Sequence, residues 1–178
     1  MERYWEIVKM LAKYFNDNNI PYMLVGAISV AAWGNPRSSR DLDLMIILGE
    51  KIADFADFLK KHGFSVDAED IEAALKERSH FTIFDDASDY VIDAKGLYSD
   101  FDRESFNRRR KADILGHEVW VSPPEDTILI KLQFGSDQDM RDARSILERQ
   151  AGKLDESYLN RKINEFGLQK QFEKIKVE

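Results

Sequence analysis

The sequence predicts an α+β fold, in which a mixed sheet with flanking helices is followed by a helical C-terminal part. Short apolar runs up to residue 121 are typical of strands, whereas the chain from Glu125 onward has helical spacing. The length of 178 residues fits one domain with its own core. We therefore expect an α/β core over residues 1–122 and a helical part over residues 123–178, packed together as one structural domain.

Helices and strands are predicted to alternate in the first part of the chain. Residues 5–15 carry apolar side chains at the spacing of an amphipathic helix. Residues 22–25 are then typical of a short buried strand, and residues 27–33 of a small-residue helix. Residues 41–48 contain the longest apolar run and predict a further strand, and an apolar stripe over residues 52–59 predicts a helix.

The middle of the chain gives weaker signals than its two ends. A short helix is expected within residues 71–75, and two strand-like runs around a polar turn predict a hairpin over residues 81–93. We expect Asp85, Asp86 and Asp89 to be plain turn residues. The remaining predictions are a strand at 119–121, helices over 127–134, 140–149 and 155–166, and a charged tail after residue 167.

Composition excludes several classes of protein. The chain has no cysteine, which rules out disulfides, thiolate zinc sites and a cysteine nucleophile. The 26 Lys and Arg against 33 Asp and Glu give a net charge of −7, which disfavours bulk electrostatic binding to nucleic acid. The first residues are too charged for a secretory signal, and no apolar run approaches the roughly 18 residues of a membrane span. We expect a cytoplasmic protein with no membrane partner.

Two aspartates enter the most apolar strand of the sequence. Because side chains alternate along a strand, Asp41 and Asp43 point to the same face, with α-carbons roughly 6–7 Å apart. Carboxylates at this distance repel each other and resist losing water unless a cation lies between them. Magnesium takes oxygen ligands and shares its coordination shell with phosphates. The spacing therefore indicates a divalent metal site, and the alternative is a solvated strand end in an acidic chain.

A strand, a glycine and a helix precede this pair, and a third carboxylate follows it. N–H groups at the start of the helix near Gly26 would favour a phosphate, with Ser29 one turn inside. Asp93 interrupts an otherwise apolar strand, and a buried carboxylate requires a cation, a lysine or a metal as its partner. An edge-strand aspartate that faces solvent is the alternative for Asp93.

These residues resemble the signature of the nucleotidyltransferase fold superfamily, whose sheet is polymerase β-like. The resemblance rests on a hydrophobic strand, Gly26-Ala27 and Arg37-x-Ser39-x-Asp41-x-Asp43. Within the superfamily, the chain is most similar to small bacterial and archaeal nucleotidyltransferases related to AbiEii-type toxins.

The C-terminal part agrees with this branch and extends the resemblance over residues 22–147. The segment Pro124-Glu125-Asp126-Thr127-Ile128-Leu129-Ile130-Lys131-Leu132 is similar to the branch's Pro-Glu-Asp-Leu-Ile-x-x-Lys-Leu segment. Asp139 and Asp142 fall where its Lys-Asp-x-x-Asp motif has acidic residues. They either orient Lys131 or cap the following helix.

The resemblance implies transfer of a nucleoside monophosphate from a nucleoside triphosphate to a hydroxyl of an acceptor. It implies that Asp41, Asp43 and Asp93 hold Mg²⁺ or Mn²⁺, that Asp93 helps to deprotonate the acceptor, and that Lys131 contacts the phosphates. The acceptor is open between tRNA, a protein and a small molecule. The toxin-like relatives also leave an antitoxin partner open.

The nucleotide-binding residues that the resemblance implies are Gly26, Ala27, Ser29, Arg37 and Ser39. Ala27 stands where the family has a second Gly or a Ser, so either Ser29 compensates or nucleotide binding is weaker. This departure keeps an alternative function open, which is a catalytically inactive nucleotide- or partner-binding module of the same fold.

One basic cluster, Arg108-Arg109-Arg110-Lys111, is not explained by the resemblance. It could grip an RNA acceptor or a triphosphate. The alternative is an ordinary solvated surface.

Overall fold

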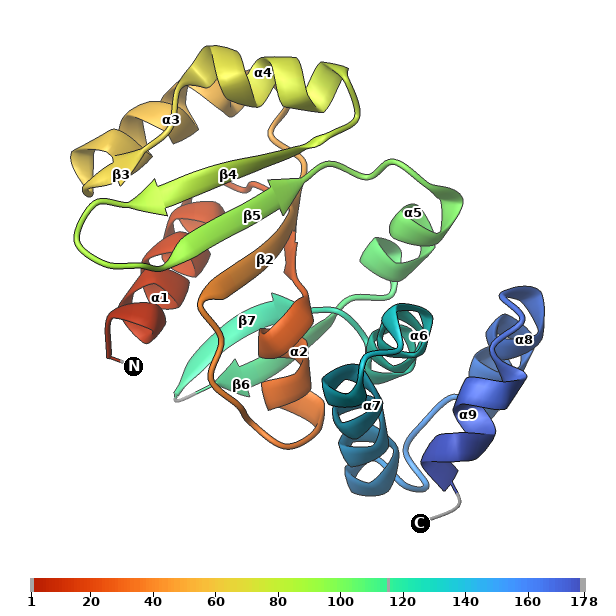
Figure 1. The fold of residues 1–178 in the computed structure, drawn as a ribbon. Coiled ribbons are helices and arrows are strands. Elements are labelled where there is room, and N and C mark those ends of the chain that lie inside the picture. Colours follow the sequence, from red (N-terminus) through yellow and green to blue (C-terminus); the bar gives the residue numbers. More distant parts are fainter. Residues whose placement is uncertain (1, 115, 177–178) are drawn as a thin grey trace.

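In the computed structural model, which describes residues 2–114 and 116–176, the strands of the chain form one seven-stranded mixed sheet. Its order is β3-β4-β5-β2-β1-β7-β6 (Figure 1). The strand bounds are β1 Tyr22–Leu24, β2 Asp41–Ile46, β3 Phe64–Ser65, β4 His80–Asp85, β5 Val91–Lys95, β6 Arg110–Ile114 and β7 His117–Val121. The central strand β2 is antiparallel to β1 and parallel to β5, and β1 is parallel to β7. The predicted α+β class with a mixed sheet is confirmed.

Helices flank this sheet and make up the C-terminal part. Their bounds are α1 Glu2–Asp17, α2 Gly26–Trp33, α3 Ile52–Lys61, α4 Ala68–Lys76, α5 Asp100–Asn107, α6 Pro124–Phe134, α7 Asp137–Arg149, α8 Glu156–Glu165 and α9 Gln169–Lys176. A short 3-10 turn, Gly49–Lys51, precedes α3. None of the helices within the described ranges is long and apolar enough to cross a membrane.

The two faces of β2 have different surroundings. Leu42, Leu44 and Ile46 are buried in the main core with the apolar sides of α1 and α3. The alternate residues face the other way, where Met45 packs against Phe106 of α5, Asp43 is partly buried and Asp41 is exposed. Alternation along one strand therefore separates the core from a polar face.

A second apolar cluster joins the C-terminal helices to one another and to α2. Val30 of α2 lies in this cluster together with Ile128, Leu132 and Ile146 of α6 and α7. Figure 1 shows α6–α9 gathered on the side of α2, away from α3 and α4. The chain passes from β7 into this part at Ser122 and Pro123, and a domain boundary after residue 122 stays a prediction.

Some elements in the middle of the chain were not predicted, and two predictions require correction. The helix α5 and the strand β6 were not expected, because their sequences are mostly polar and give no apolar stripe. The expected charged tail after residue 167 is instead the helix α9, whose Phe172 and Ile175 are buried in the second cluster. Asp85 is not a plain turn residue, since it is 5% exposed and accepts hydrogen bonds of 2.6 and 3.0 Å from Arg3.

Candidate active site

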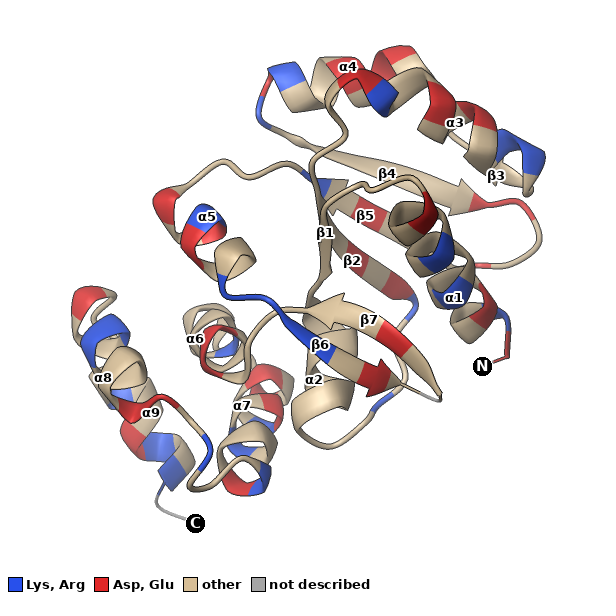
Figure 2. Cartoon of the chain, turned by 180° about the vertical axis from the view of Figure 1, so that it is seen from behind, with Lys and Arg blue, Asp and Glu red and all other residues tan. Residues whose placement is uncertain are grey.

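The strands β2 and β5 bring two predicted metal ligands side by side. In the parallel register, Asp43 lies opposite Asp93, and Asp41 lies opposite Val91. Residues that are paired in this way project from the same face, so Asp41, Asp43 and Asp93 share one face of the sheet. Figure 2 shows the acidic segments of β2 and β5 next to each other. Asp93 is not an edge-strand residue, which was the alternative from the sequence, because β5 lies between β2 and β4.

The three carboxylates share a face without converging on one point. Within residues 2–114 and 116–176, no group of three or more His, Cys, Asp and Glu side chains lies close enough to hold a metal ion. The carboxylate oxygens are nevertheless the ligands that Mg²⁺ and Mn²⁺ take. The donor chemistry thus fits a hard divalent cation, and a common ion for Asp41, Asp43 and Asp93 stays a prediction.

Thr82 holds the carboxylate of Asp93 from the neighbouring strand. It lies opposite Asp93 in the antiparallel pair of β4 and β5, and its hydroxyl donates to Oδ1 of Asp93 at 2.6 Å. Sequence analysis missed Thr82, although the predicted hairpin placed it near Asp93. The hydrogen bond restricts the orientation of the Asp93 side chain.

The carboxylate of Asp43 is partly buried and interacts with charged side chains of both signs. Burial raises its pKa above the usual value, and the neighbouring carboxylates Asp93 and Asp41 raise it further, while Lys131 and Arg37 act in the opposite direction. The negative form of Asp43 therefore lacks sufficient compensation from the protein. A divalent cation would supply this compensation. After the oxygen donor chemistry, this is the second reason why the three carboxylates fit a divalent cation.

Gly26 connects the start of α2 with Asp43. Its φ is +60°, a conformation that L side chains rarely adopt, and a β-carbon at this position would lie 2.0 Å from Oδ2 of Asp43. The helix α2 begins at Gly26, and no side chain caps its N-terminus. Its first N–H groups therefore lack a side-chain acceptor and suit an anion.

Ser29 has a structural place in the same turn. It is fully buried, and its hydroxyl donates to the carbonyl oxygen of Leu24 at 3.0 Å. The hydroxyl stabilises the connection between β1 and α2 and lines neither of the cavities described below. Direct compensation for Ala27 by Ser29 has no support in this geometry.

A cavity of about 580 Å³ opens beside Asp43. Its lining includes Gly26 and Asp43 from the sheet region and Lys131 from α6. Phe101 of α5 and the 76% exposed Phe134 of α6 add apolar surface. The cavity therefore combines a carboxylate, a lysine, the N-terminus of a helix and aromatic faces.

Lys131 lies in a network of charges between α6, α7 and the loop before β2. Its ammonium group lies 2.8 Å from Asp139 and 3.2 Å from Asp142, and its side chain is only 9% exposed. Asp142 also accepts hydrogen bonds of 3.0 and 3.2 Å from Nε of Arg37. Asp142 thus joins Arg37 to Lys131, and Lys131 lines the cavity beside Asp43.

Asp139 performs both of the roles that the sequence left open. It pairs with Lys131, and with Ser136 it forms a reciprocal cap of α7. Burial acts to raise the pKa of Asp139, but hydrogen bonds from Lys131 and Ser136 outweigh burial and hold the pKa below its usual value.

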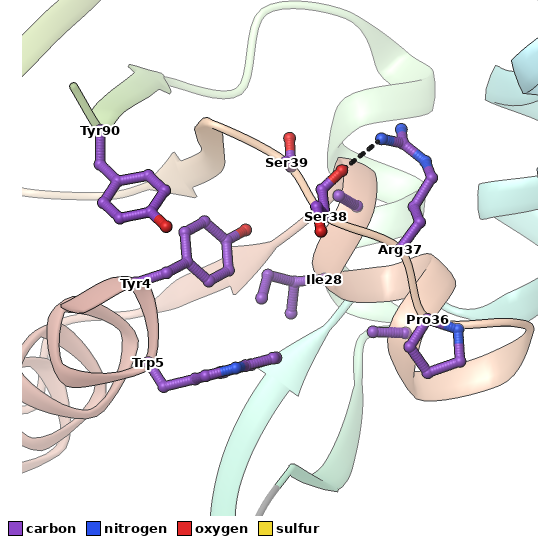
Figure 3. Close-up of a pocket in the computed structure, with 10 residues that line it drawn as sticks. Tyr4, Trp5, Ile28, Pro36, Arg37, Ser38, Ser39 and Tyr90 are labelled. Atoms are coloured by element: carbon purple, nitrogen blue, oxygen red, sulfur yellow. Dashed lines mark hydrogen bonds between the residues drawn. The ribbon is translucent and has the colours of Figure 1, made fainter. Parts of the chain in front are cut away.

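The predicted nucleotide-binding residues separate into two groups. Gly26 lines the cavity beside Asp43, whereas Ala27, Arg37 and Ser39 line a second cavity of about 300 Å³ (Figure 3). The guanidinium group of Arg37 turns to Asp142 and to the carbonyl oxygen of Ser38. The structure therefore does not bring all of these residues to one cavity.

The basic cluster at residues 108–111 contacts other parts of the chain. Arg108 and Arg110 each lie 3.3 Å from the fully buried carboxylate of Glu125, and Lys111 lies 2.6 Å from Glu118. The guanidinium of Arg108 also lies 3.4 Å from the centre of the Tyr158 ring. The cluster therefore joins the sheet region to α6 and α8. The sequence suggested either a grip on RNA or a triphosphate or a solvated surface, and neither alternative includes these internal contacts.

Comparisons with known proteins identify the fold. No family model and no curated protein sequence matches the chain. A crystal structure of ANT(2″)-Ia in complex with adenylyl-2″-tobramycin matches at 16% identity and a TM-score of 0.63, covering 93% of this chain and 99% of that chain. A nucleotidyltransferase-like antigenic protein from Paracoccidioides brasiliensis matches at 16% identity and a TM-score of 0.55, covering 90% of this chain and 87% of that chain.

A third similar structure is TM1012 from Thermotoga maritima, a protein named as a candidate nucleotidyltransferase. It matches at 14% identity and a TM-score of 0.52, covering 83% of this chain and 94% of that chain. Likeness at such low identity concerns the fold and not the activity. The nearer resemblance to AbiEii-type proteins stays a prediction. The chain has the nucleotidyltransferase-like fold: a mixed sheet with flanking helices and a helical C-terminal part.

Proposed function

We propose that the protein transfers a nucleotidyl group from a nucleoside triphosphate to a hydroxyl of an acceptor. The observation that carries the proposal is the pairing of Asp43 with Asp93 across β2 and β5, beside the uncapped start of α2. It unites carboxylates for a divalent cation with N–H groups for a phosphate. The shared fold with nucleotidyltransferases supports the same function.

Asp41, Asp43 and Asp93 are the residues that would hold Mg²⁺ or Mn²⁺. When bound, the cation neutralises charge on the triphosphate and on the departing pyrophosphate. Asp93 also accepts the proton of the acceptor hydroxyl, and Thr82 keeps its carboxylate oriented for this role. Asp43, packed against Gly26, places negative charge next to the start of α2.

The triphosphate occupies the cavity beside Asp43. Lys131 lines this cavity and contributes positive charge, while Asp139 and Asp142 hold its ammonium group in place. The first N–H groups of α2, at Gly26 and Ala27, contact a phosphate. Arg37 acts through Asp142, which it shares with Lys131.

The acceptor is an RNA, a protein or a small molecule. The similar structure of ANT(2″)-Ia holds adenylyl-2″-tobramycin, an adduct of a small molecule, and the comparisons favour no other class of acceptor. An antitoxin partner and a cytoplasmic location belong to the same proposal and rest on the sequence resemblance and composition alone.

A catalytically inactive binding module of the same fold is the second candidate. Two observations favour it. The described carboxylates do not converge, and Ala27 occupies the position where the family has Gly or Ser. Such a module would bind a nucleotide at the same cavity without turnover.

The test is incubation with each α-labelled nucleoside triphosphate, Mg²⁺ and three acceptor pools: RNA, protein and a small-molecule set that includes tobramycin. Asp43→Asn is compared with Asp86→Asn, which changes an exposed aspartate in the turn between β4 and β5. We expect label transfer that Asp43→Asn abolishes and Asp86→Asn retains. Transfer that survives in Asp43→Asn contradicts the proposed site, whereas saturable nucleotide binding without transfer supports the inactive module.

A further inference from the structure

The second cavity is built from aromatic rings and from one side of α2 (Figure 3). Tyr4 and Trp5 come from the first turns of α1, and Tyr90 comes from the turn before β5. The ring of Tyr4 lies 5.4 Å from each of the other two rings, measured between centroids. Ile28 and Ala31 of α2 form part of the remaining lining.

Size and lining favour a single ring as the occupant. The volume of about 300 Å³ is at the lower end of the range for small-molecule sites, which is roughly 300–1,000 Å³. Aromatic and aliphatic walls favour the flat apolar face of another ring. A nucleoside triphosphate, with its three charged phosphates, does not suit this lining.

A polar cavity of about 540 Å³ adjoins the aromatic one. The two cavities share Ser38, Ser39 and Tyr90, and the lining of the polar cavity also includes Arg40 and Asp89. In the described part of the chain, neither Arg40 nor Asp89 has a side-chain hydrogen bond or an ion pair, with each other or with another residue. A site with one cation and one anion, both without a protein partner, suits a ligand that carries both signs of charge.

We propose that the two cavities together bind an aromatic α-amino acid or a similar aromatic zwitterion. The ring occupies the cavity of Tyr4, Trp5 and Ile28, the carboxylate meets Arg40, and the ammonium group meets Asp89. Arg37 does not compete with Arg40 for the carboxylate, because its guanidinium is held by Asp142 and the Ser38 carbonyl oxygen. The inference goes beyond nucleotidyl transfer and does not depend on it.

The experiment is an NMR titration of the full chain that follows the indole N–H signals of its 3 tryptophans, with the Trp5 signal assigned by Trp5→Phe. Four probes separate the parts of the ligand. L-Phenylalanine carries the ring and both charges, phenethylamine lacks the carboxylate, 3-phenylpropionate lacks the ammonium group, and L-alanine lacks the ring. We expect saturable binding of L-phenylalanine at Trp5, binding about tenfold weaker for each singly charged probe, and none for L-alanine.

Variants assign each charge to its residue. Arg40→Gln lowers the affinity for L-phenylalanine to that for phenethylamine and leaves phenethylamine unaffected. Asp89→Asn lowers it to that for 3-phenylpropionate and leaves 3-phenylpropionate unaffected. Both positions are exposed, so these variants fold, and Asp86→Asn in the same turn is the matched control with unchanged affinity. Ala31→Phe fills the aromatic cavity and abolishes binding of all the ring compounds.

Three results overturn the proposal. The first is the absence of a saturable shift at Trp5 with L-phenylalanine. The second is equal affinity for the three ring compounds, which would show that Arg40 and Asp89 do not select the ligand. The third is a shift of the backbone N–H signals of Gly26 and Lys131, followed in the same titration, with Trp5 unchanged, which would place the ligand in the cavity beside Asp43. Because the readout is binding, failure of nucleotidyl transfer leaves all these outcomes unaffected.

Discussion

Gly26 faces Asp43 so closely that a β-carbon on Gly26 would lie 2.0 Å from Oδ2 and 2.9 Å from Cγ of the Asp43 side chain. The contact joins the start of α2, which offers N–H groups, to the strand that carries the carboxylates. Any side chain at residue 26 therefore displaces Asp43 as well as straining its own backbone. The position thus tests whether the placement of Asp43 beside α2 is needed for function.

Replacing Gly26 with alanine is expected to reduce both stability and nucleotidyl transfer. Gly49→Ala is the matched control, since Gly49 has a φ of +55° against +60° for Gly26 and a β-carbon there would meet no atom within 4 Å. We expect Gly49→Ala to lower the free energy of unfolding by about 1–2 kcal/mol, the cost of a positive φ. Gly26→Ala should lower it further and abolish transfer. Equal urea midpoints and equal activities in the two variants would show that the contact with Asp43 is unimportant.

Thr82 is predicted to act through the orientation of Asp93. Thr82→Val removes the hydroxyl that donates to Oδ1 of Asp93, and Thr82→Ser keeps a donor. We expect about a tenfold loss of the transfer rate in Thr82→Val, with a fall of about 1 kcal/mol in the free energy of unfolding. Thr82→Ser should recover most of the rate. If the two variants show the same rate, orientation by the hydroxyl has no part in the reaction.

Asp142 is predicted to hold the charge network together. Asp142→Asn weakens the pairs with Arg37 and Lys131 at a carboxylate whose side chain is 3% exposed. Because Arg37 is partly exposed and Lys131 keeps Asp139, we expect a loss of about 2–3 kcal/mol in the free energy of unfolding. Asp137→Asn, at an exposed position of the same helix, serves as the control. Urea unfolding that gives similar values for both variants would contradict this account of the network.

The pair of Arg3 and Asp85 should make stability depend on pH on the acid side. Hydrogen bonds from Arg3 hold the pKa of Asp85 below its usual value, against the opposing effect of burial. The folded pKa is thus below the unfolded value of about 3.9, so the contribution is complete above the unfolded pKa and is lost as pH falls through the folded pKa. The stability difference between wild type and Arg3→Gln should therefore shrink as urea unfolding is repeated from pH 6 down towards pH 3. A constant difference over this range would assign the effect of Arg3 to packing alone.

Local rules predicted much of the fold and the shared face of two carboxylates. Alternation along residues 41–46 places Asp41 and Asp43 together, because this property belongs to one strand. The alignment of Asp43 with Asp93 depends on the pairing of β2 with β5. Pairing register between distant segments is set by tertiary packing, so the sequence indicated Asp93 as a candidate without its place opposite Asp43.

The sequence did not predict in which direction some side chains point or which charged residues pair. A hydroxyl near a glycine suggests a phosphate contact, yet Ser29 turns inward to the carbonyl oxygen of Leu24. A run of basic residues suggests a surface, yet Arg108 and Arg110 meet a buried Glu125 from a segment 15–17 residues away. Both outcomes depend on which groups the fold brings together, and local spacing does not contain that information.

In the proposed function, Asp43 and Asp93 hold one divalent cation together with a nucleoside triphosphate. The decisive measurement is Mn²⁺ binding in the presence of ATP, followed by the electron paramagnetic resonance signal of free Mn²⁺ at increasing protein concentration. We predict saturable, protein-dependent loss of free Mn²⁺ beyond that caused by ATP alone, absent in Asp43→Asn and Asp93→Asn and retained in Asp86→Asn. Unchanged Mn²⁺ binding in Asp43→Asn and Asp93→Asn would contradict a shared cation at these two carboxylates.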